Sequence, residues 1–152
     1  SDILSDFRLV EEKKIIEKLF QHINANSGLA SYGLKEVIEF LKNNIADTVI
    51  ITDDTNLYRI ELECKKCQNI REEILERPEI IPKKTQLLSE PCPSCNSMDM
   101  KLSEQDIIDY LALIAAKTGT KIEVVAGKAE HGVMLSSLGK IGAILRYNPN
   151  FN

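Results

Sequence analysis

The residues of this chain best suited to chemistry are its four cysteines, which form two Cys-x-x-Cys pairs. Cys64 and Cys67 form one pair, Cys92 and Cys95 form the other, and 24 residues lie between them. Each pair can direct two thiolates at one point, so the two pairs together can complete a tetrahedron around one Zn²⁺ ion. Four thiolates leave no open position for water or substrate, which predicts a structural ion rather than a catalytic one.

Two other arrangements of the cysteines remain open from the sequence. Two disulfides would require an oxidising compartment, but the polar and charged residues around Ser1 show no signal-peptide pattern. A redox dithiol would require a cysteine of lowered pKa at the start of a helix, but both pairs have polar, turn-like surroundings. We therefore favour zinc and expect a cytoplasmic protein.

The segment between the two pairs has few apolar residues with which to build a core, since charged residues and prolines dominate it. A core this small needs an additional cross-link to stay folded, which a bound zinc ion would provide. We expect Asn69 and Asn96, which follow the pairs, to adopt a left-handed backbone. The predicted domains are an α/β core made of residues 1–63 and 97–152, and an inserted zinc-binding mini-domain at residues 64–96.

Hydrophobic periodicity outside the pairs predicts helices and strands in alternation. Helices are expected over residues 3–25, 34–45, 107–119 and 130–138, and strands over 48–52, 58–63, 121–126 and 141–147. Ser103-x-x-Asp106 is typical of a capping box before the third helix, and residues 31–33 are expected to form a loop. This order predicts an α/β/α sandwich with a mixed sheet and an inserted small zinc-ribbon-like mini-domain.

Composition and charge narrow the classes of function. The chain is 43% apolar, enough for a core, and no apolar run reaches the roughly 18 residues of a membrane span. Aromatic residues make up only 5% and tryptophan is absent, which disfavours stacking on single-stranded nucleic acid. Residues 1–64 carry 7 basic against 12 acidic side chains, which suits docking onto a protein better than binding RNA directly.

The sequence offers no positive case for an enzyme. It has no glycine-rich phosphate loop and no nucleophile elbow. His22 and His131 have no evident catalytic partner, and we expect both at the surface, with His22 also suited to capping the first helix. The neighbouring Asp53 and Asp54 follow a strand and are expected to form a solvated turn.

Three stretches resemble one family. They are Leu29–Val37 with Ala46–Ile51, the paired cysteines, and Gly139–Tyr147, whose sequence Gly-Lys-Ile-Gly-Ala-Ile-Leu-Arg-Tyr is the most specific. Together they resemble the C-terminal domain (domain 3) of the archaeal class 1 translation termination factors, peptide chain release factor subunit 1. Neither the Gly-Gly-Gln nor the Asn-Ile-Lys-Ser motif of that family occurs here. The resemblance therefore implies a docking domain that is not catalytic by itself.

The resemblance also implies partners. These are the translational GTPase that delivers the factor, the ribosome-recycling ATPase, and the ribosome through the full-length protein. The family's GTPase contact corresponds here to Phe20, Leu138, Ile144, Leu145, Arg146 and Tyr147. By pattern alone, the first four of these residues are expected in the core. Lys140 stands where the family has a glycine, and Leu138 where it has an aromatic residue.

Two alternative functions remain. One is the C-terminal domain of the related ribosome-rescue factor Pelota, for which paired Cys-x-x-Cys motifs are not expected. The other is a zinc-ribbon module that binds nucleic acid through Lys65, Lys66, Lys83 and Lys84. The segment from Lys65 to Pro91 carries 6 basic against 5 acidic residues, which gives little support to that second alternative.

Overall fold

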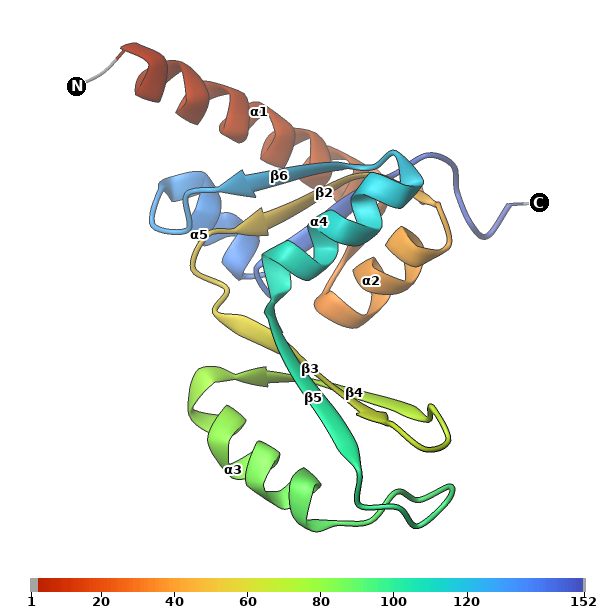
Figure 1. Ribbon diagram of the computed structural model, residues 1–152. Coiled ribbons are helices and arrows are strands. Elements are labelled where there is room, and N and C mark those ends of the chain that lie inside the picture. The colour runs from red at the N-terminus through yellow and green to blue at the C-terminus, as the bar shows by residue number, and fades with distance from the viewer. Residues whose placement is uncertain (1–2, 152) are drawn as a thin grey trace. The chain divides into compact units, whose positions relative to one another are not determined.

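The computed structural model describes residues 3–151, which form two compact units (Figure 1). One unit contains the chain up to Thr55 and again from Leu111 onward, and the other runs from Asn56 to Tyr110. The second unit includes more residues on both sides than the predicted mini-domain at 64–96, because the strands on either side of that segment pair with each other. The described residues hold five helices and two sheets.

The first unit is built on a mixed four-stranded sheet, as predicted. Its strands are β1 (Ala30–Tyr32), β2 (Ala46–Thr52), β6 (Lys121–Val125) and β7 (Ile141–Leu145), in the order β1-β7-β2-β6. The β2–β6 pair is parallel, and the other two pairs are antiparallel. All five residues of β7 and six of the seven in β2 are buried, so these two strands form the centre of the core.

Helices cover both faces of this sheet (Figure 1). They are α1 (Ile3–Asn24), α2 (Leu34–Lys42), α4 (Ile107–Thr118) and α5 (Glu130–Ser136). Ile16 and Leu19 of α1 and Leu135 of α5 pack on one face, and α2 and α4 lie on the other. Ile3, Phe7 and Val10 of α1 are exposed, because the first turns of this helix extend beyond the part that packs on the sheet.

The second unit has its own small core. Strands β3 (Leu57–Cys64), β4 (Ile70–Glu76) and β5 (Met100–Asp106) form an antiparallel sheet in the order β4-β3-β5, and α3 (Arg77–Ser89) packs against it. Ile60, Leu75 and Ile80 are buried together with the half-buried Tyr58 and Leu102. β4, β5 and α3 were not predicted from the sequence. The β4 sequence Ile-Arg-Glu-Glu-Ile-Leu-Glu has no strict apolar–polar alternation, the end of β5 resembles a helix cap, and Pro82 lies inside α3.

Two local predictions were wrong. The predicted loop at 31–33 contains most of β1. Among the described residues this strand pairs with the distant strand β7 alone, so it leaves little local signal in the sequence. Ser103 lies in β5 and is not a helix cap. Asp106 alone caps α4, because its Oδ1 atom accepts a hydrogen bond of 2.8 Å from the N–H of Ile108.

His131 is buried, against the expectation of a surface position. Its Nε2 atom lies 3.0 Å from Oε1 of Glu12, which also accepts a 3.0 Å hydrogen bond from the N–H of Ala126. A side chain at Gly132 would collide with the carbonyl oxygen of Ala126, so the glycine lets α5 approach this turn closely. His22 is half-buried near the end of α1, with Nδ1 3.0 Å from Oγ of Ser27. The hydroxyl of Ser27, and not the His22 ring, donates to the carbonyl of His22, at 3.3 Å.

None of the helices within residues 3–151 combines the length and the apolar character that a membrane crossing requires.

Candidate metal centre and docking surface

The paired strands of the second unit bring the two Cys-x-x-Cys pairs together. Cys64 is the last residue of β3 and pairs with Met100, the first residue of β5. The first pair therefore begins where β3 ends, and the second pair lies just before β5 begins. The N–H of Lys65 donates to the carbonyl of Asp99 at 2.9 Å, which extends this pairing by one step into the loops.

The two cysteine loops have the same backbone structure, and we call them the first knuckle (64–69) and the second knuckle (92–97). In the first, the carbonyl of Cys64 accepts from the N–H of Gln68, and the N–H of Cys64 donates to the carbonyl of Asn69, both at 2.9 Å. In the second, Cys92 makes the same two bonds at 2.8 Å, with residues 96 and 97.

Each knuckle turns through one left-handed residue at the fifth position. These residues are Gln68, with φ of 62°, and Asn96, with φ of 66°. The prediction for Asn96 is confirmed, whereas the one for Asn69 was wrong by one position. The matching hydrogen bonds identify Gln68 as the equivalent of Asn96, which the asparagine preference alone does not reveal.

The four sulfur atoms fit a tetrahedral metal site. The Sγ atoms of Cys64 and Cys95 are 3.5 Å apart, those of Cys67 and Cys92 are 3.6 Å apart, and all four lie within 4.8 Å of one another. Zinc–sulfur bonds of about 2.3 Å in a tetrahedron place neighbouring sulfurs about 3.8 Å apart. The arrangement is therefore close to what one Zn²⁺ ion requires.

The electrostatics of the cluster also favour a cation. Burial opposes ionisation of Cys92, but N–H donors of its knuckle and the neighbouring thiols stabilise the thiolate and lower its pKa to about 6. The N–H of Asn69 favours the Cys67 thiolate, but burial and the adjacent sulfurs outweigh it and raise the pKa of Cys67 to about 12. The pKa of Cys64 is lowered, chiefly by the N–H of Cys67. Four sulfurs this close hold their full negative charge only around a cation that displaces the remaining protons.

The two rival arrangements of the cysteines have less support. No disulfide joins the four cysteines, and the Cys64–Cys95 and Cys67–Cys92 sulfurs are 3.5 and 3.6 Å apart, well beyond an S–S bond of about 2.0 Å. A redox dithiol of the helix-opening kind is also disfavoured, because both knuckles are turns outside the helices.

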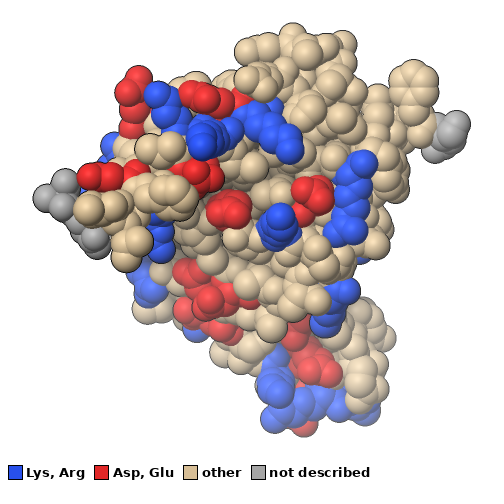
Figure 2. All heavy atoms as spheres, turned by 90° about the horizontal axis from the view of Figure 1, so that it is seen from above, with Lys and Arg blue, Asp and Glu red and all other residues tan. Residues whose placement is uncertain are grey.

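The predicted basic patch for nucleic acid is largely neutralised. Lys83 pairs with Glu73 at 3.0 Å, and Lys84 pairs with Glu104 at 2.6 Å. Lys65 lies 3.9 Å from Asp99. Figure 2 shows acidic and basic side chains intermingled over the upper and middle parts of the face that it draws, with a group of basic side chains at its lower end. These pairings weaken the nucleic-acid alternative, because phosphate binding depends on unneutralised Lys and Arg.

The six residues predicted to contact a partner differ in exposure. Ile144 and Leu145 are 4% and 5% exposed within β7, and the half-buried Phe20 and Leu138 pack against the core that contains Ile144. Their burial therefore favours a role for these four residues in the core over direct contact with a partner. Tyr147 is 52% exposed.

Arg146 is exposed at the surface, but its polar atoms are bound to the main chain. Nε donates to the carbonyl of Ala46 at 3.1 Å, and Nη2 donates to the carbonyl of Thr118 at 2.9 Å. Its N–H donates to the carbonyl of Ile45 at 2.8 Å. Arg146 thus joins the end of β7 to the start of β2 and the C-terminal turn of α4.

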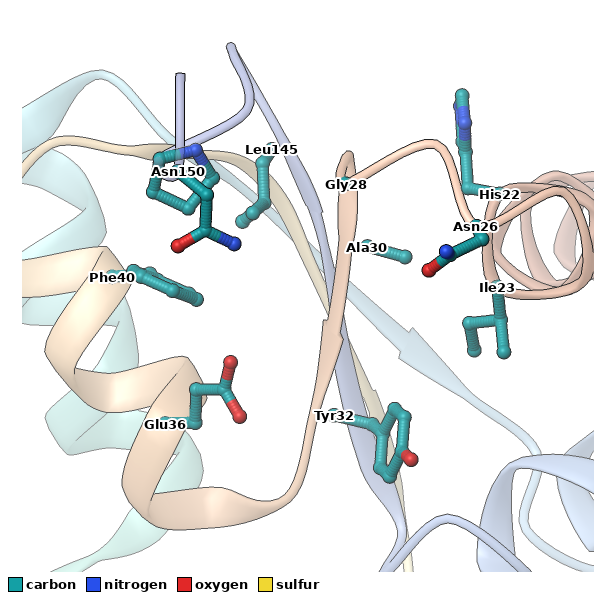
Figure 3. Close-up of a pocket in the computed structure, with 11 residues that line it drawn as sticks. His22, Ile23, Asn26, Gly28, Ala30, Tyr32, Glu36, Phe40, Leu145 and Asn150 are labelled. Atoms are coloured by element: carbon teal, nitrogen blue, oxygen red, sulfur yellow. The ribbon is translucent and has the colours of Figure 1, made fainter. Parts of the chain in front are cut away.

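A hollow of about 470 Å³ lies beside β1, close to the predicted contact residues, and we call it the β1 groove (Figure 3). Its walls come from α1, α2 and the segment after β7. The lining residues are His22, Ile23, Asn26, Gly28, Ala30, Tyr32, Glu36, Phe40, Leu145, Pro149 and Asn150. In Figure 3, Asn26, Glu36 and Asn150 extend into the hollow from three sides.

The floor of the β1 groove is a free strand edge. Leu29 accepts from the N–H of Leu145, and the N–H of Gly33 donates to Ile141, so alternate residues of β1 face β7. The main-chain groups of Ala30 and Tyr32 consequently point away from the sheet, as on any edge strand. Apart from Leu145, none of the residues that line the groove was predicted as a site, because an edge is a property of strand order and not of residue type.

Lys140 occupies a left-handed position with φ of 72°, next to Gly139 with φ of 93°. Glycine is the residue that adopts such a backbone without strain. The left-handed backbone at position 140 thus explains why the family pattern has a glycine there. Lys140 departs from that pattern, and its Nζ donates to the carbonyl of Asp54 at 3.2 Å.

Most of the chain matches a single family model. The match covers residues 9–149 and is described as eRF1 domain 3. The chain belongs to the eRF1 domain 3 family. The peptide chain release factor subunit 1 of Methanocaldococcus jannaschii is 31% identical to this eRF1 domain 3 chain over 147 residues, which are 95% of the chain and 35% of the relative. The chain spans about a third of the length of that relative.

Solved structures with a similar fold include a peptide chain release factor and Pelota proteins. The C-terminal domain of the peptide chain release factor from Methanosarcina mazei has a TM-score of 0.81 and 26% identity to this eRF1 domain 3, covering 96% of this chain and 88% of that one. Pelota from Archaeoglobus fulgidus has a TM-score of 0.58 at 22% identity, covering 97% and 33%. A chain of a structure described as ribosome-bound archaeal Pelota and ABCE1 has a TM-score of 0.52 at 21% identity, covering 95% and 28%. The last two similarities concern the fold alone.

Proposed function

We propose that this eRF1 domain 3 is the C-terminal docking domain of a class 1 translation termination factor and is not catalytic by itself. The observation that carries the proposal is the family match over residues 9–149. The domain would bind the translational GTPase and the ribosome-recycling ATPase, reach the ribosome as part of a full-length factor, and act in the cytoplasm. The fold similarity to a chain of the Pelota–ABCE1 structure supports an ATPase partner.

The GTPase surface, in this proposal, is the β1 groove together with Tyr147. Four of the predicted contact residues would support this surface without touching the partner, because they are half-buried or buried and hold α1, α5 and β7 in place. They are Phe20, Leu138, Ile144 and Leu145. Tyr147 supplies a half-exposed aromatic ring of the kind enriched at interfaces. Arg146 orients the chain before Tyr147 through its three main-chain bonds.

Zinc has a supporting role in this function. We propose that Cys64, Cys67, Cys92 and Cys95 hold one structural Zn²⁺, which would neutralise the thiolates and fix both knuckles. The donor set leaves no site for a substrate, so the ion would stabilise the second unit and take no part in a reaction. The finer architecture, a zinc-ribbon-like mini-domain on an α/β/α core, belongs to the same proposal.

Calorimetric titration with an archaeal translational GTPase of the elongation-factor 1 alpha type tests the docking surface. Tyr32→Ala and Tyr147→Ala should each weaken binding at least about tenfold, because exposed aromatic side chains dominate such interfaces. Val124→Ala on the opposite edge of the sheet is the matched control and should bind like the unaltered chain. Unchanged affinity in both tyrosine variants would overturn the assigned surface, and absence of binding by the unaltered chain would overturn the GTPase partner.

The alternative function is that of a Pelota-type rescue domain, which the fold similarity to Pelota supports. The 31% identity over 95% of the chain to the release factor of Methanocaldococcus jannaschii favours termination. Full-length protein containing this domain should release peptide from ribosomes halted at a stop codon. Release that ignores the codon, or splitting of stalled ribosomes without release, would favour the rescue factor.

A further inference from the structure

The β1 groove has the shape and the main-chain groups to receive an extended segment. The N–H and C=O groups of Ala30 and Tyr32 point away from β7, so a chain laid along β1 can pair with both residues. A strand advances about 3.3 Å per residue, so the three-residue edge of β1 matches a segment of about three to five residues. The edge alone does not select which residues that segment carries.

The charge of the β1 groove does select among partners. Glu36 is the one acidic or basic residue that lines the groove within residues 3–151, with histidine counted as neutral at pH 7. Its side chain is exposed and has no hydrogen bond or ion pair within the described residues. A groove whose formal charge comes from one unpaired carboxylate complements a basic side chain and disfavours an acidic one.

Glu36 also has a structural role, because it lies in the first turn of α2, where the helix dipole favours a carboxylate. That role does not occupy its oxygen atoms, since no side-chain hydrogen bond caps the start of α2. Figure 3 shows the carboxylate of Glu36 pointing from α2 into the hollow. The carboxylate is therefore free to bind a cation of a partner.

Aromatic rings border the same hollow. Phe40 lies one turn after Glu36 on α2, and its ring also points into the hollow, whereas Tyr32 lies on β1 (Figure 3). A guanidinium can stack on a ring with its flat face while its N–H groups bind a carboxylate, whereas the ammonium of lysine has no flat face. The combination of Glu36 and Phe40 therefore favours arginine over lysine.

The second unit contains an example of this kind of contact. Cζ of Arg59 lies 4.6 Å from the centre of the Tyr110 ring, and its Nη2 lies 2.9 Å from Oε1 of Glu61. One arginine thus contacts a ring and a carboxylate together, in the way that an arginine between Phe40 and Glu36 would.

We propose that the β1 groove binds an extended, arginine-bearing segment of a partner protein as a fifth strand of the four-stranded sheet. Main-chain hydrogen bonds to Ala30 and Tyr32 would supply affinity, and Glu36 would hold the guanidinium against the Phe40 ring. The identity of the partner as the translational GTPase rests on the proposed function, whereas the selection of arginine rests on the groove itself.

The first test uses the whole chain and three short blocked peptides, in which valine alternates with arginine, lysine or glutamate. The arginine peptide should shift the amide resonances of α2 and β1 and protect the Ala30 and Tyr32 amides from exchange. The lysine peptide, of equal charge, should bind about fivefold more weakly, and the glutamate peptide should not bind. Absence of binding by the arginine peptide, equal binding of either control peptide, or unchanged exchange at Ala30 and Tyr32 would overturn the proposal.

Glu36→Gln is the decisive variant, because it removes the charge at an exposed position and keeps the shape of the side chain. It should weaken the arginine peptide about five- to tenfold, the effect of losing a charge-assisted hydrogen bond. Glu39→Gln is the matched control, since Glu39 is exposed on the same helix but does not line the groove, and it should bind like the unaltered chain. Undiminished binding by Glu36→Gln would refute the arginine site.

Calorimetric titration with the GTPase separates this inference from the proposed function. Glu36→Gln should weaken the GTPase about fivefold, and Glu39→Gln should not. If Tyr147→Ala weakens the GTPase and Glu36→Gln does not, the docking function stands and the arginine site is wrong. If the unaltered chain binds the arginine peptide at β1 but does not bind the GTPase, the GTPase partner is wrong and the selection of an arginine-bearing strand stands.

Discussion

At the scale of single residues, the positions of the four cysteine sulfur atoms are what favours a metal site. The four Sγ atoms lie within 4.8 Å of one another, although 24 residues separate the two pairs in sequence. The matching hydrogen bonds of the two knuckles aim N–H groups toward the sulfurs, as in the bond from Ser94 to Cys92 Sγ at 3.4 Å. The cysteines are therefore oriented by backbone that is equivalent in both loops.

Replacing Cys92 by serine should remove zinc binding almost completely. Loss of one thiolate weakens the affinity by more than the roughly 100-fold that altered outer-shell contacts produce. Zinc content measured by atomic absorption should fall from one ion per chain to near zero. Ser94→Ala in the same knuckle is the control and should retain the ion. A Cys92→Ser protein with a full zinc content would contradict the four-cysteine site.

The Glu12–His131 contact makes a second residue-scale prediction. Glu12→Ala leaves the buried His131 ring and the Ala126 N–H without their shared acceptor, which should cost about 2–3 kcal/mol of unfolding free energy. Glu12→Gln keeps an acceptor and should cost about 1 kcal/mol. Urea denaturation followed by circular dichroism measures both, with the exposed Glu17→Ala as control. Equal stability of Glu12→Ala and Glu17→Ala would show that the contact contributes nothing.

At the scale of elements, the sheet of the first unit has two protected centre strands and two free edges. β7 and β2 are almost wholly buried, whereas β1 and β6 each present outward main-chain groups beside a groove. The grooves arise because α1 borders both edges, with its C-terminal end at β1 and its middle at β6. One helix thus borders both edges of the sheet.

Arg146 joins three elements, so its removal should affect stability rather than docking alone. Arg146→Ala leaves the carbonyls of Ala46 and Thr118 without their cationic donor and should lower the unfolding free energy by about 2 kcal/mol. Tyr147→Ala, one residue later, should change stability by less than about 0.5 kcal/mol. Thermal denaturation of the two variants side by side makes the comparison. A stable Arg146→Ala protein with weakened GTPase binding would restore the direct-contact interpretation.

At the scale of the molecule, the chain divides into two units that depend on different forces. The first buries a sheet between helices, whereas the second is smaller and has an apolar cluster around Ile60, Leu75 and Ile80. A core of that size gives limited stability by itself, which is where a bound metal contributes most.

Removing zinc with a strong chelator should therefore destabilise the second unit selectively. Hydrogen exchange should accelerate at the knuckles and in β3, β4 and β5, because the zinc-binding free energy is part of the folding free energy there. Amides of β2 and β7 should keep their protection, and re-addition of zinc should reverse the change. Equal loss of protection in both units would mean that they fold as one cooperative body.

How much could be predicted differs from element to element. The stripe of Ile16 and Leu19, the apolar run of β2 and the alternation of β3 are local patterns, and each element lies where its pattern predicts. β1 and β4 were missed because one is a three-residue strand paired only with β7 and the other is half glutamate and arginine. The burial of His131 depends on a partner 119 residues away in the chain, which no local pattern reveals.

The sequence by itself determined the candidate ligand types, the central strands and four of the five described helices, because residue chemistry and hydrophobic periodicity act over a few neighbouring residues. Only the tertiary structure decided that the two knuckles meet, that Gln68 and not Asn69 takes the left-handed position, and that Arg146 is bound to main-chain carbonyls. It also decided which strands end at an edge. These properties depend on pairing between segments far apart in the chain, where the order of strands, and not the identity of any one residue, sets which groups remain available to a partner.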